Sequence, residues 1–493
     1  MITDAEANGG TSWFSAKEKF RERSGGRDRR SDRKEKDMKT AGIDIGTTTI
    51  SLVLIDGESG QMVGKKTIEH GSGSFLKGEF ETSRIQDPGR ICSLALSGFE
   101  ELTKDCDDVK AIGMTGQMHG MLYVDRNGMA VSPLYTWQDG SGDLLLPEEN
   151  ISMASFLREN VGNAAAGYGV TTHAYLQRTG RIPGEAVSMV TISDYLAMRM
   201  CGNTAPFIST DMAASWGCFD LEGKSFQKDR LHEAGVDVTF LPQVHALHDV
   251  VGQTKDGIPV ICSLGDNQAS VIGSVRDISS TLLLNVGTGS QVSMGTEKYI
   301  PCSGSVELRP CTEDLYLLSG SSLCGGRAYA MLEQFFRSAP GCDSEEALYD
   351  CMLAQAEEFL ARHDREEVWK IRPVFSGTRS NPEESGSISG IRTTNFTPGA
   401  MTAGMILGIL EELDGYYSQM KKLTEKKASV LVGSGNGIRR NPLMRRLAEE
   451  LFGMPMRIPA FCEEAAFGAA LAALHAAGYT ATLQEAQKMI SYE

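Results

Sequence analysis

One aspartate stands at a point of the sequence where an acid could take part in chemistry. Asp266 follows Leu264-Gly265 and precedes a stretch with the character of a helix. Aspartate at such a junction is an effective helix N-cap, because its carboxylate accepts a backbone N–H of the first turn. The same carboxylate could face a cleft and accept a proton from a substrate hydroxyl. This segment alone leaves both interpretations open.

Two short loops combine glycine with hydroxyl side chains. The first covers residues 44–49 (Asp-Ile-Gly-Thr-Thr-Thr), and the second covers residues 285–290 (Asn-Val-Gly-Thr-Gly-Ser). Glycine permits a tight turn, and amides with hydroxyls can surround phosphate oxygens. Asp44, just before the first turn, is placed to hold a metal through water, as Mg²⁺ prefers. Plain hairpin turns remain the alternative for each loop, whereas the pair could hold a polyphosphate from two sides.

A third glycine-rich run, residues 433–437, lies between a strand-like and a helix-like segment. Such a turn allows a flat ring to lie against the backbone. The run is not the G-x-G-x-x-G pattern that opens a first βαβ unit, so dinucleotide binding is disfavoured. An ordinary strand-to-helix turn is the alternative.

Two further segments place polar groups beside an aromatic ring. They are Gln117-Met118-His119-Gly120 and residues 136–140, which read Thr-Trp-Gln-Asp-Gly. A polyol needs this mixture, because a ring face packs against C–H groups while amides and carboxylates bind hydroxyls. A core histidine at position 119 and a packing role for Trp137 are the alternatives.

These residues need strands and helices that hold them in place. Apolar runs and turn residues predict strands at 50–55, 61–68, 109–114, 281–286, 291–294 and 428–432. They also predict a hairpin at 121–128 and a strand–loop–helix segment at 257–273. Helices are expected within 151–200, 399–420 and 442–452. The pattern strand, Gly-Thr turn, strand occurs at 42–50 and again half a chain later at 281–294. We therefore expect two similar α/β domains with a cleft between them.

Composition narrows the function classes. The chain has 493 residues, of which 41% are hydrophobic and 23% charged, as in globular proteins of two or three domains. It has no apolar run of membrane-spanning length and no apolar core of a signal peptide, so we expect a cytoplasmic protein without a membrane partner. Eleven cysteines without a C-x-x-C pair fit reduced thiols, and a net charge of −16 disfavours nucleic acid as a partner. Residues 1–38, charged and poor in apolar groups from position 15 on, are predicted to be a disordered tail.

Together these segments resemble the FGGY family of carbohydrate kinases. The resemblance is carried, in the family's order, by residues 42–50, 115–120, 136–140, 264–270, 285–290, 319–327, 373–390 and 433–444. It covers the chain from Ala41 to about Gly478, and the ordered set is far more specific than any single motif. It implies an α/β fold of two ribonuclease-H-like (actin/sugar-kinase) domains with an interdomain cleft. The implied domains are 39–273, with the sugar and magnesium/phosphate site, and 274–493, with the nucleotide site.

The resemblance also implies roles for individual residues, with ATP and Mg²⁺ as the cofactors. Asp266 resembles the family's catalytic base. The remaining residues match positions that hold the metal (Asp44, with Asp266), the nucleotide (Thr47, Thr48, Gly287, Thr288, Gly325, Gly326, and more approximately Gly433 and Asn436) and the sugar (Gln117, Met118, His119, Trp137, Asp139).

The implied activity is ATP-dependent phosphorylation of a sugar on a terminal primary hydroxyl. Residues 117–120, 136–140 and 211–220 resemble branches of the family that act on ketoses. Two departures bear on fine specificity: residues 376–379 lack the acid that the family often has there, and Asp143 stands where relatives often have a basic residue. A kinase for another ketose, an actin-like ATPase and a catalytically silent sugar sensor are the alternatives. Monomer and homodimer both remain open.

Overall fold

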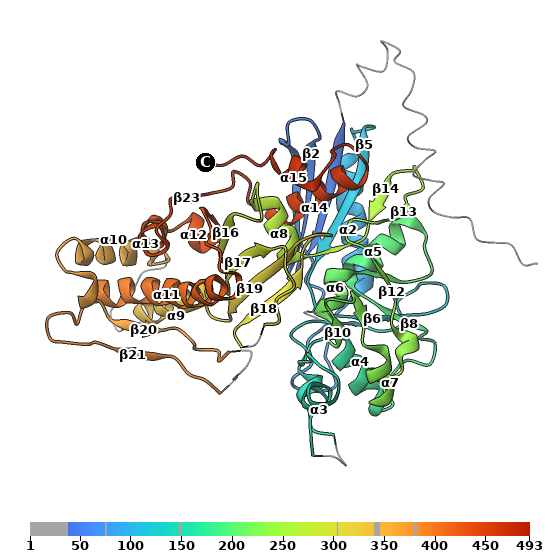
Figure 1. The fold of residues 1–493 in the computed structure, drawn as a ribbon, viewed down its shortest axis with the longest axis horizontal. Coiled ribbons are helices and arrows are strands. Elements are labelled where there is room, and N and C mark those ends of the chain that lie inside the picture. The colour runs from blue at the N-terminus through green and yellow to red at the C-terminus, as the bar shows by residue number, and fades with distance from the viewer. Residues whose placement is uncertain are drawn as a thin grey trace, which may run out of the picture.

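The computed structural model describes residues 38–73, 76–146, 150–302, 304–339, 346–378, 381 and 383–493, which form two lobes side by side (Figure 1). The tail predicted at 1–38 lies outside the described residues except for Met38. Met38 is buried with Val53 and Ile55 in a core cluster, so the prediction of a disordered tail is wrong for this residue. Among the described helices, none has the length and apolar character needed to cross a membrane.

The first lobe is built on a seven-stranded sheet. Its strands are β1 (Lys39–Ile45), β2 (Thr49–Asp56), β3 (Met62–Glu69), β5 (Val109–Gly116), β13 (Val250–Gln253), β14 (Pro259–Ile261) and β15 (Leu264–Gly265). β1 is antiparallel to β2 and parallel to β5, and β2 is antiparallel to β3. Because β1 and β2 are largely buried on both faces, they have the continuous apolar character that the sequence indicated. Helices α2 (Pro88–Thr103) and α5 (Ile192–Cys201) pack on this sheet.

The second lobe repeats this strand arrangement. Its sheet has the order β18 (Val306–Pro310), β19 (Tyr316–Ser322), β17 (Ser290–Thr296), β16 (Thr281–Val286), β22 (Val430–Ser434) and β23 (Met456–Arg457). β16 is antiparallel to β17 and parallel to β22, as β1 is to β2 and β5. The expected pair of similar α/β domains is therefore confirmed. Each predicted Gly-Thr loop joins the first two strands of its sheet.

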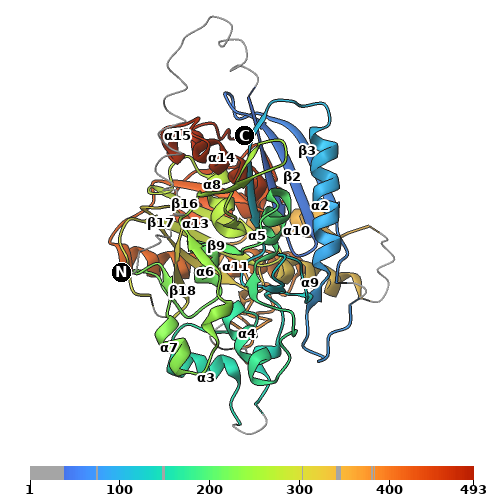
Figure 2. The same ribbon diagram turned by 90° about the vertical axis from the view of Figure 1, so that its right-hand side faces the viewer.

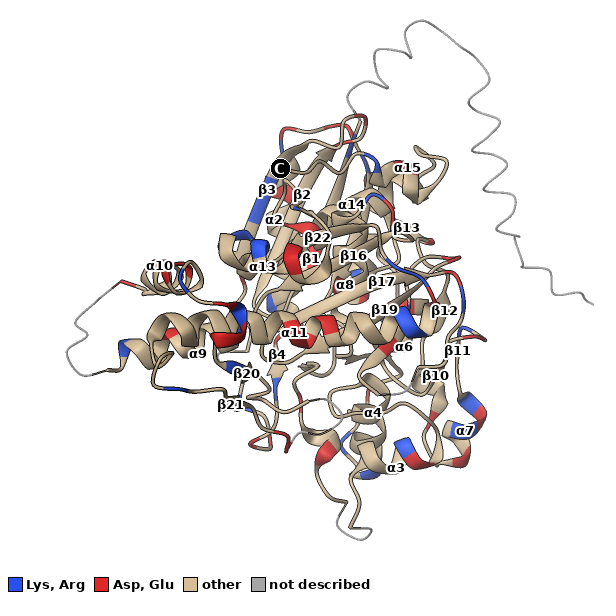
Figure 3. Ribbon diagram, turned by 60° about the vertical axis from the view of Figure 1, so that its left-hand side comes forward, with Lys and Arg blue, Asp and Glu red and all other residues tan. Residues whose placement is uncertain are grey.

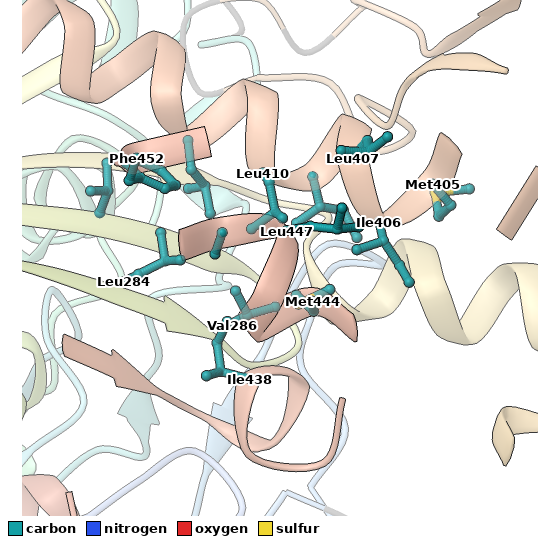
Figure 4. Close-up of a cluster of buried hydrophobic side chains, with 14 of the residues drawn as sticks. Leu284, Val286, Met405, Ile406, Leu407, Leu410, Ile438, Met444, Leu447 and Phe452 are labelled. Atoms are coloured by element: carbon teal, nitrogen blue, oxygen red, sulfur yellow. The ribbon is translucent and has the colours of Figure 1, made fainter. Parts of the chain in front are cut away.

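Helices cover the second sheet and enclose its core. They are α9 (Gly326–Arg337), α10 (Tyr349–Leu360), α11 (Pro398–Thr424), α12 (Asn436–Arg439) and α13 (Pro442–Phe452), with the small pair β20 (Lys370–Arg372) and β21 (Ser387–Ser389) alongside. Figure 4 shows side chains of β16, α11, α12 and α13 meeting in this core, among them Leu284, Leu410 and Leu447. The core fixes the strand ends from which the second loop and the 433–437 turn project.

A helix from the end of the chain packs on the first sheet. α14 (Glu464–Ala476) lies against β1 and β5 on one side and α8 (Asp266–Ser274) on the other, with α15 (Leu483–Gln487) following it (Figures 1 and 2). Glycines permit this approach: a Cβ on Gly42 or Gly113 would overlap backbone oxygens of α14, and a Cβ on Gly468 would overlap the backbone of α8. The first lobe is therefore completed by residues from the C-terminal end.

Small elements between β5 and β13 form the rest of the first lobe. They are β6 (Leu122–Val124), β7 (Leu134–Tyr135), α3 (Met153–Asn160), α4 (Gly169–Arg178), β8 (Ser188–Val190), β9 (Phe207–Ser209), α6 (Thr210–Ser215), β10 (Phe219–Asp220), β11 (Ser225–Phe226), α7 (Lys228–Glu233) and β12 (Gln243–His245), with β4 (Ile85–Gln86) paired to β7. Residues of both charge signs are interspersed along the ribbon of the two lobes (Figure 3).

The hairpin predicted at 121–128 forms, but the segment that returns from its turn is not a regular strand. Gly128 N donates to Asp125 O in the turn, and isolated antiparallel bridges join Val124 to Ala130 and Met121 to Tyr135. β6 pairs in addition with β8, a partner that was not predicted. The chain after the turn soon reaches Pro133, which has no N–H for a strand ladder.

Candidate active site

Two carboxylates from distant parts of the sequence lie within electrostatic range of Asp44, near the end of β1. Asp44 belongs to β1, Asp266 is the first residue of α8, and Glu463 directly precedes α14. Burial raises the pKa of Asp44 to about 7, with further contributions from the charges of Asp266 and Glu463. Glu463 was not predicted, because nothing in the sequence shows that the C-terminal helix returns to the first sheet.

The Asp44 carboxylate has features of a cation site. Its Oδ1 atom is buried and has no hydrogen-bond partner within the described chain. A carboxylate oxygen in that position is costly unless an ion or water meets it. The described residues contain no group of three His, Cys, Asp or Glu side chains suited to hold an ion directly. The arrangement therefore fits an ion held largely through water, as Mg²⁺ prefers.

Asp266 is not the N-cap of α8. Gly265 occupies that position, and Oδ1 of Asp266 accepts the backbone N–H of Asn267 at 2.7 Å. The N-cap interpretation is therefore wrong, although the carboxylate does satisfy an N–H of the first turn. Met118 of the predicted sugar set lies beside Gly265, because a Cβ on that glycine would be 2.7 Å from the Met118 Sδ atom.

The first glycine–threonine loop contacts the predicted sugar residues. Nε1 of Trp137 donates to Oγ1 of Thr47 at 3.0 Å, and Nε2 of Gln86 donates to the Thr47 carbonyl at 2.7 Å. Gln117 donates in turn to Oε1 of Gln86 at 3.1 Å, while its own Oε1 is buried without a described partner. Thr48 is exposed at the tip of the loop. Gln86, which links the two sets, was not predicted.

His119 is held in an uncommon conformation. Its φ is +72°, in the left-handed region that residues other than glycine rarely adopt. Its backbone N–H donates to Oγ of Ser215 at 3.1 Å, and its Nδ1 lies 2.6 Å from the Ser215 carbonyl, which can only accept. The ring stacks on Tyr168, with centroids 4.5 Å apart and planes 8° apart. Nδ1 therefore carries a proton. Tyr168 and Ser215 were not predicted as site residues.

Asp139 and Trp137 differ in their surroundings. Asp139 is buried, and its oxygens accept hydrogen bonds from Arg84 N at 2.9 Å and from the N–H and hydroxyl of Ser141. Trp137, by contrast, is 39% exposed. The Asp139 carboxylate thus joins the segment around Arg84 to the segment 139–141. Asp143, the acidic departure from the family pattern, is exposed at the end of a 3-10 turn. Of the other departure, Ser376 to Thr378 are described and Arg379 is not.

The second loop packs against the start of α9. Gly326 N donates to the Gly287 carbonyl at 2.8 Å, and Arg327 N donates to the Thr288 carbonyl at 2.9 Å. A Cβ on Gly325 would lie 2.6 Å from the Cβ of Ser290. The structure therefore brings together four of the predicted nucleotide residues, and it shows why two of them are glycines.

The 433–437 turn divides into a buried and an exposed part. Gly433 lies inside β22, where a Cβ would be 2.7 Å from Ile438, so its small size serves packing. Asn436 is exposed at the start of α12. Gly435, with φ of +81°, makes the close approach to the Val286 carbonyl of β16. The turn thus lies beside the strand that leads into the second loop.

Two hydrogen bonds tie the start of α8 to the other lobe. Nη1 of Arg309, in β18, donates to Oδ1 of Asn267 at 3.2 Å, and Nε2 of Gln268 donates to the Pro310 carbonyl at 3.0 Å. The Arg309 guanidinium also pairs with Glu307 at 2.6 Å. The segment that carries Asp266 is therefore held from both lobes. No pattern in the sequence distinguished Arg309 from other charged strand residues.

The repeated sheets with their glycine–threonine loops define a two-domain protein of the actin-like fold. Solved structures agree. A xylulose kinase from Lactobacillus acidophilus superimposes with a TM-score of 0.79, at 21% identity, over 92% of this chain and 93% of its own. A glycerol kinase from Plasmodium falciparum solved with ADP gives a TM-score of 0.76 at 16% identity, over 92% of each chain. At these identities the likeness concerns the fold alone.

Sequence comparison identifies the family. Residues 40–273 match the N-terminal domain, and residues 282–477 the C-terminal domain, of the FGGY family of carbohydrate kinases. The chain belongs to this family and is a carbohydrate kinase. Sedoheptulokinase from Mus musculus is 27% identical over 88% of this chain and 97% of its own length. Xylulose kinase from Klebsiella pneumoniae is 23% identical over 80% of this chain and 81% of its own length.

Proposed function

We propose that the protein transfers the γ-phosphoryl group of ATP to the terminal primary hydroxyl of sedoheptulose, giving sedoheptulose 7-phosphate. The observation that carries the proposal is a convergence at one place. Trp137 contacts the Thr47 loop, Met118 contacts the residue before Asp266, and Asp266 is electrostatically coupled to Asp44. The choice of sugar is supported by the likeness to sedoheptulokinases over nearly their whole length.

In the proposed reaction Asp266 acts as the general base. The sugar oxygen forms a bond to the γ-phosphorus, the bond from that phosphorus to the ADP oxygen breaks, and the hydroxyl proton passes to the Asp266 carboxylate. Such proton transfer contributes roughly 10²–10⁴-fold to the rate. Most of the acceleration in phosphoryl transfer comes from positioning and charge stabilisation. We assign phosphate contacts to Thr47, Thr48, Gly287 and Thr288.

The remaining ligand contacts follow the two lobes. We propose that the domain 39–273, on whose sheet α14 packs, holds sugar and magnesium, and that the domain 274–493 holds the nucleotide. In the first, Gln117, Met118, His119 and Trp137 would surround the sugar, with Asp139 supporting them. In the second, the segments containing Gly325, Gly326, Gly433 and Asn436 would border the nucleotide. Closure of the lobes would exclude water and so protect ATP from hydrolysis.

Asp44 and Asp266 would hold Mg²⁺, largely through water, and the ion would neutralise phosphate charge. The buried, unpartnered Asp44 Oδ1 supports this assignment. Since the pKa of Asp44 is raised to about 7, a proton competes with the cation below that pH. We therefore expect the affinity for magnesium chloride, measured by calorimetry, to be about tenfold weaker at pH 6 than at pH 8, with proton release on binding.

The matched control for this measurement is Asp44→Asn, which cannot ionise. The variant should bind the cation weakly, with little dependence on pH. Unchanged binding in the variant would show that Asp44 is not a ligand, and equal affinity of the wild-type protein at both pH values would contradict the raised pKa.

A panel of sugars tests the substrate. ADP release should be measured by a coupled assay with sedoheptulose, xylulose and ribulose, and with water as the only acceptor. We expect the highest kcat/KM with sedoheptulose. A pentulose is the second candidate, favoured by the likeness to xylulose kinases. If the enzyme turns over a pentulose but not sedoheptulose, that pentulose is the substrate. ATP hydrolysis unaffected by every sugar would contradict the proposed reaction.

A further inference from the structure

A short helix connects two parts of the candidate active site. α6 (Thr210–Ser215) belongs to the segment 211–220, which so far has no assigned role. Its first turn contacts the chain just before Asp266, and its last residue contacts His119. The two residues at issue, Asp211 and Ser215, are 1% and 6% exposed.

At the first end, Asp211 supports the backbone that leads into α8. Its Oδ2 accepts the N–H of Gly265 at 2.8 Å, and its Oδ1 accepts the hydroxyl of Ser209 and the N–H of Met212. The Ser209 hydroxyl lies 2.6 Å from the Ser263 carbonyl as well. β15 pairs only with β5, so no described strand covers its other edge. The Asp211 carboxylate takes the place of that missing strand at Gly265.

At the other end, Ser215 and Trp216 support the predicted sugar segment. Ser215 accepts both the backbone N–H of His119 and its Nδ1–H, as described above. The indole N–H of Trp216, which is fully buried, donates to the Gly120 carbonyl at 3.0 Å. The Ser215 hydroxyl also donates to the Met212 carbonyl at 2.7 Å, which closes the helix on itself. These bonds hold His119 at its positive φ.

We propose that α6 is a rigid spacer that sets the distance between the sugar-binding segment and Asp266, with Asp211 and Ser215 as positioning residues. The inference rests on the proposed kinase reaction and deepens it. A helix has a fixed rise of about 1.5 Å per residue, so the two ends cannot move independently. Phosphoryl transfer depends on placement, and a shift of about 1 Å can cost roughly 10²-fold in rate.

The two ends predict different kinetic effects. Asp211→Asn keeps the shape of the side chain but introduces NH₂ where oxygens accept hydrogen bonds, so Gly265 and Asp266 should shift. We expect kcat to fall about 10²-fold, with KM for sugar and ATP within about threefold of wild type. Ser215→Ala leaves the His119 N–H without its acceptor. We expect KM for the sugar to rise about tenfold, with a smaller change in kcat.

Asp194→Asn is the matched control. Asp194 is also fully buried and accepts three hydrogen bonds, from Thr191 and from the N–H and hydroxyl of Ser263, but it lies one contact further from Asp266. We expect it to lower the melting temperature as much as Asp211→Asn while reducing kcat by less than about threefold. If kcat falls in proportion to the fall in melting temperature in both variants, Asp211 is merely structural and the proposal fails.

A second variant at Ser215 tests the proposal if Asp211→Asn does not fold. Ser215→Thr retains the hydroxyl, so its KM for the sugar should return to the wild-type value from the raised value of Ser215→Ala. A KM that stays raised in Ser215→Thr would overturn the proposal. All variants are measured with the sugar that the wild-type enzyme turns over fastest. If the wild-type enzyme does not turn over sedoheptulose, the proposed substrate is wrong. The proposed role of α6 is tested separately, by whether Asp211→Asn lowers kcat and Ser215→Ala raises KM.

Discussion

Replacement of Asp266 by asparagine is expected to lower the rate of sugar phosphorylation by roughly 10²–10⁴-fold and to leave ADP affinity within a few-fold of wild type. An amide cannot accept the hydroxyl proton at neutral pH. Its oxygen can still accept the Asn267 N–H that the carboxylate accepts at 2.7 Å, so the start of α8 should survive. The loss is therefore expected in kcat, and the melting temperature should change little.

A second carboxylate near the other end of α8 provides the control. Asp277 accepts hydrogen bonds from Ser279 and Ser280 but lies outside the candidate site. Asp277→Asn should retain nearly full kcat. The measurements are a coupled ADP-release assay and calorimetric titration with ADP. Turnover by Asp266→Asn close to that of Asp277→Asn would remove Asp266 from the role of base.

Local pattern was sufficient for the repeated fold. β16 is an apolar run that is followed by Gly-Thr-Gly and a second strand, β17, and the same strand, Gly-Thr turn, strand pattern at β1 and β2 made the two lobes predictable. Such runs predict strands because burial on both faces removes the polar alternation. The turn after β6 was predictable because its signal is local, whereas the additional pairing of β6 with β8 depends on tertiary packing and was not predicted.

Residues of the site that act through long-range contacts could not be predicted. Glu463 reaches Asp44 only because α14 crosses back to the first sheet, and Tyr168 meets His119 through the placement of α4. In the sequence each is an ordinary surface or core residue. Gly433 shows another limit of local pattern, because the glycine-rich run suggested ligand contact and only the structure shows that a Cβ there would meet Ile438 and Met456.

The helix that completes the first lobe is expected to be highly sensitive to added volume. A Cβ on Gly113 of β5 would overlap the Ala469 carbonyl of α14. The helix cannot simply withdraw, because it packs against α8 on its other side, where Gly468 meets the backbone of Ala269. Overpacking typically costs about 1–3 kcal/mol, and an overlap with backbone that cannot move belongs at the upper end, about 3 kcal/mol. We expect Gly113→Ala to reduce the free energy of unfolding by about that amount, as measured by denaturant titration.

Replacement of glycine by alanine is expected to raise the free energy of unfolding where the added Cβ has space. Gly415 lies within α11, and a Cβ there would meet no atom within 4 Å. Gly415→Ala should raise the free energy of unfolding by about 0.5–1 kcal/mol, because alanine restricts the unfolded chain and favours helix. The contrast isolates steric overlap from the general effect of replacing glycine. α14 packs against α8, which begins at Asp266, so any Gly113→Ala protein that folds should also lose activity. Stability and activity equal to those of Gly415→Ala would contradict the close packing of α14.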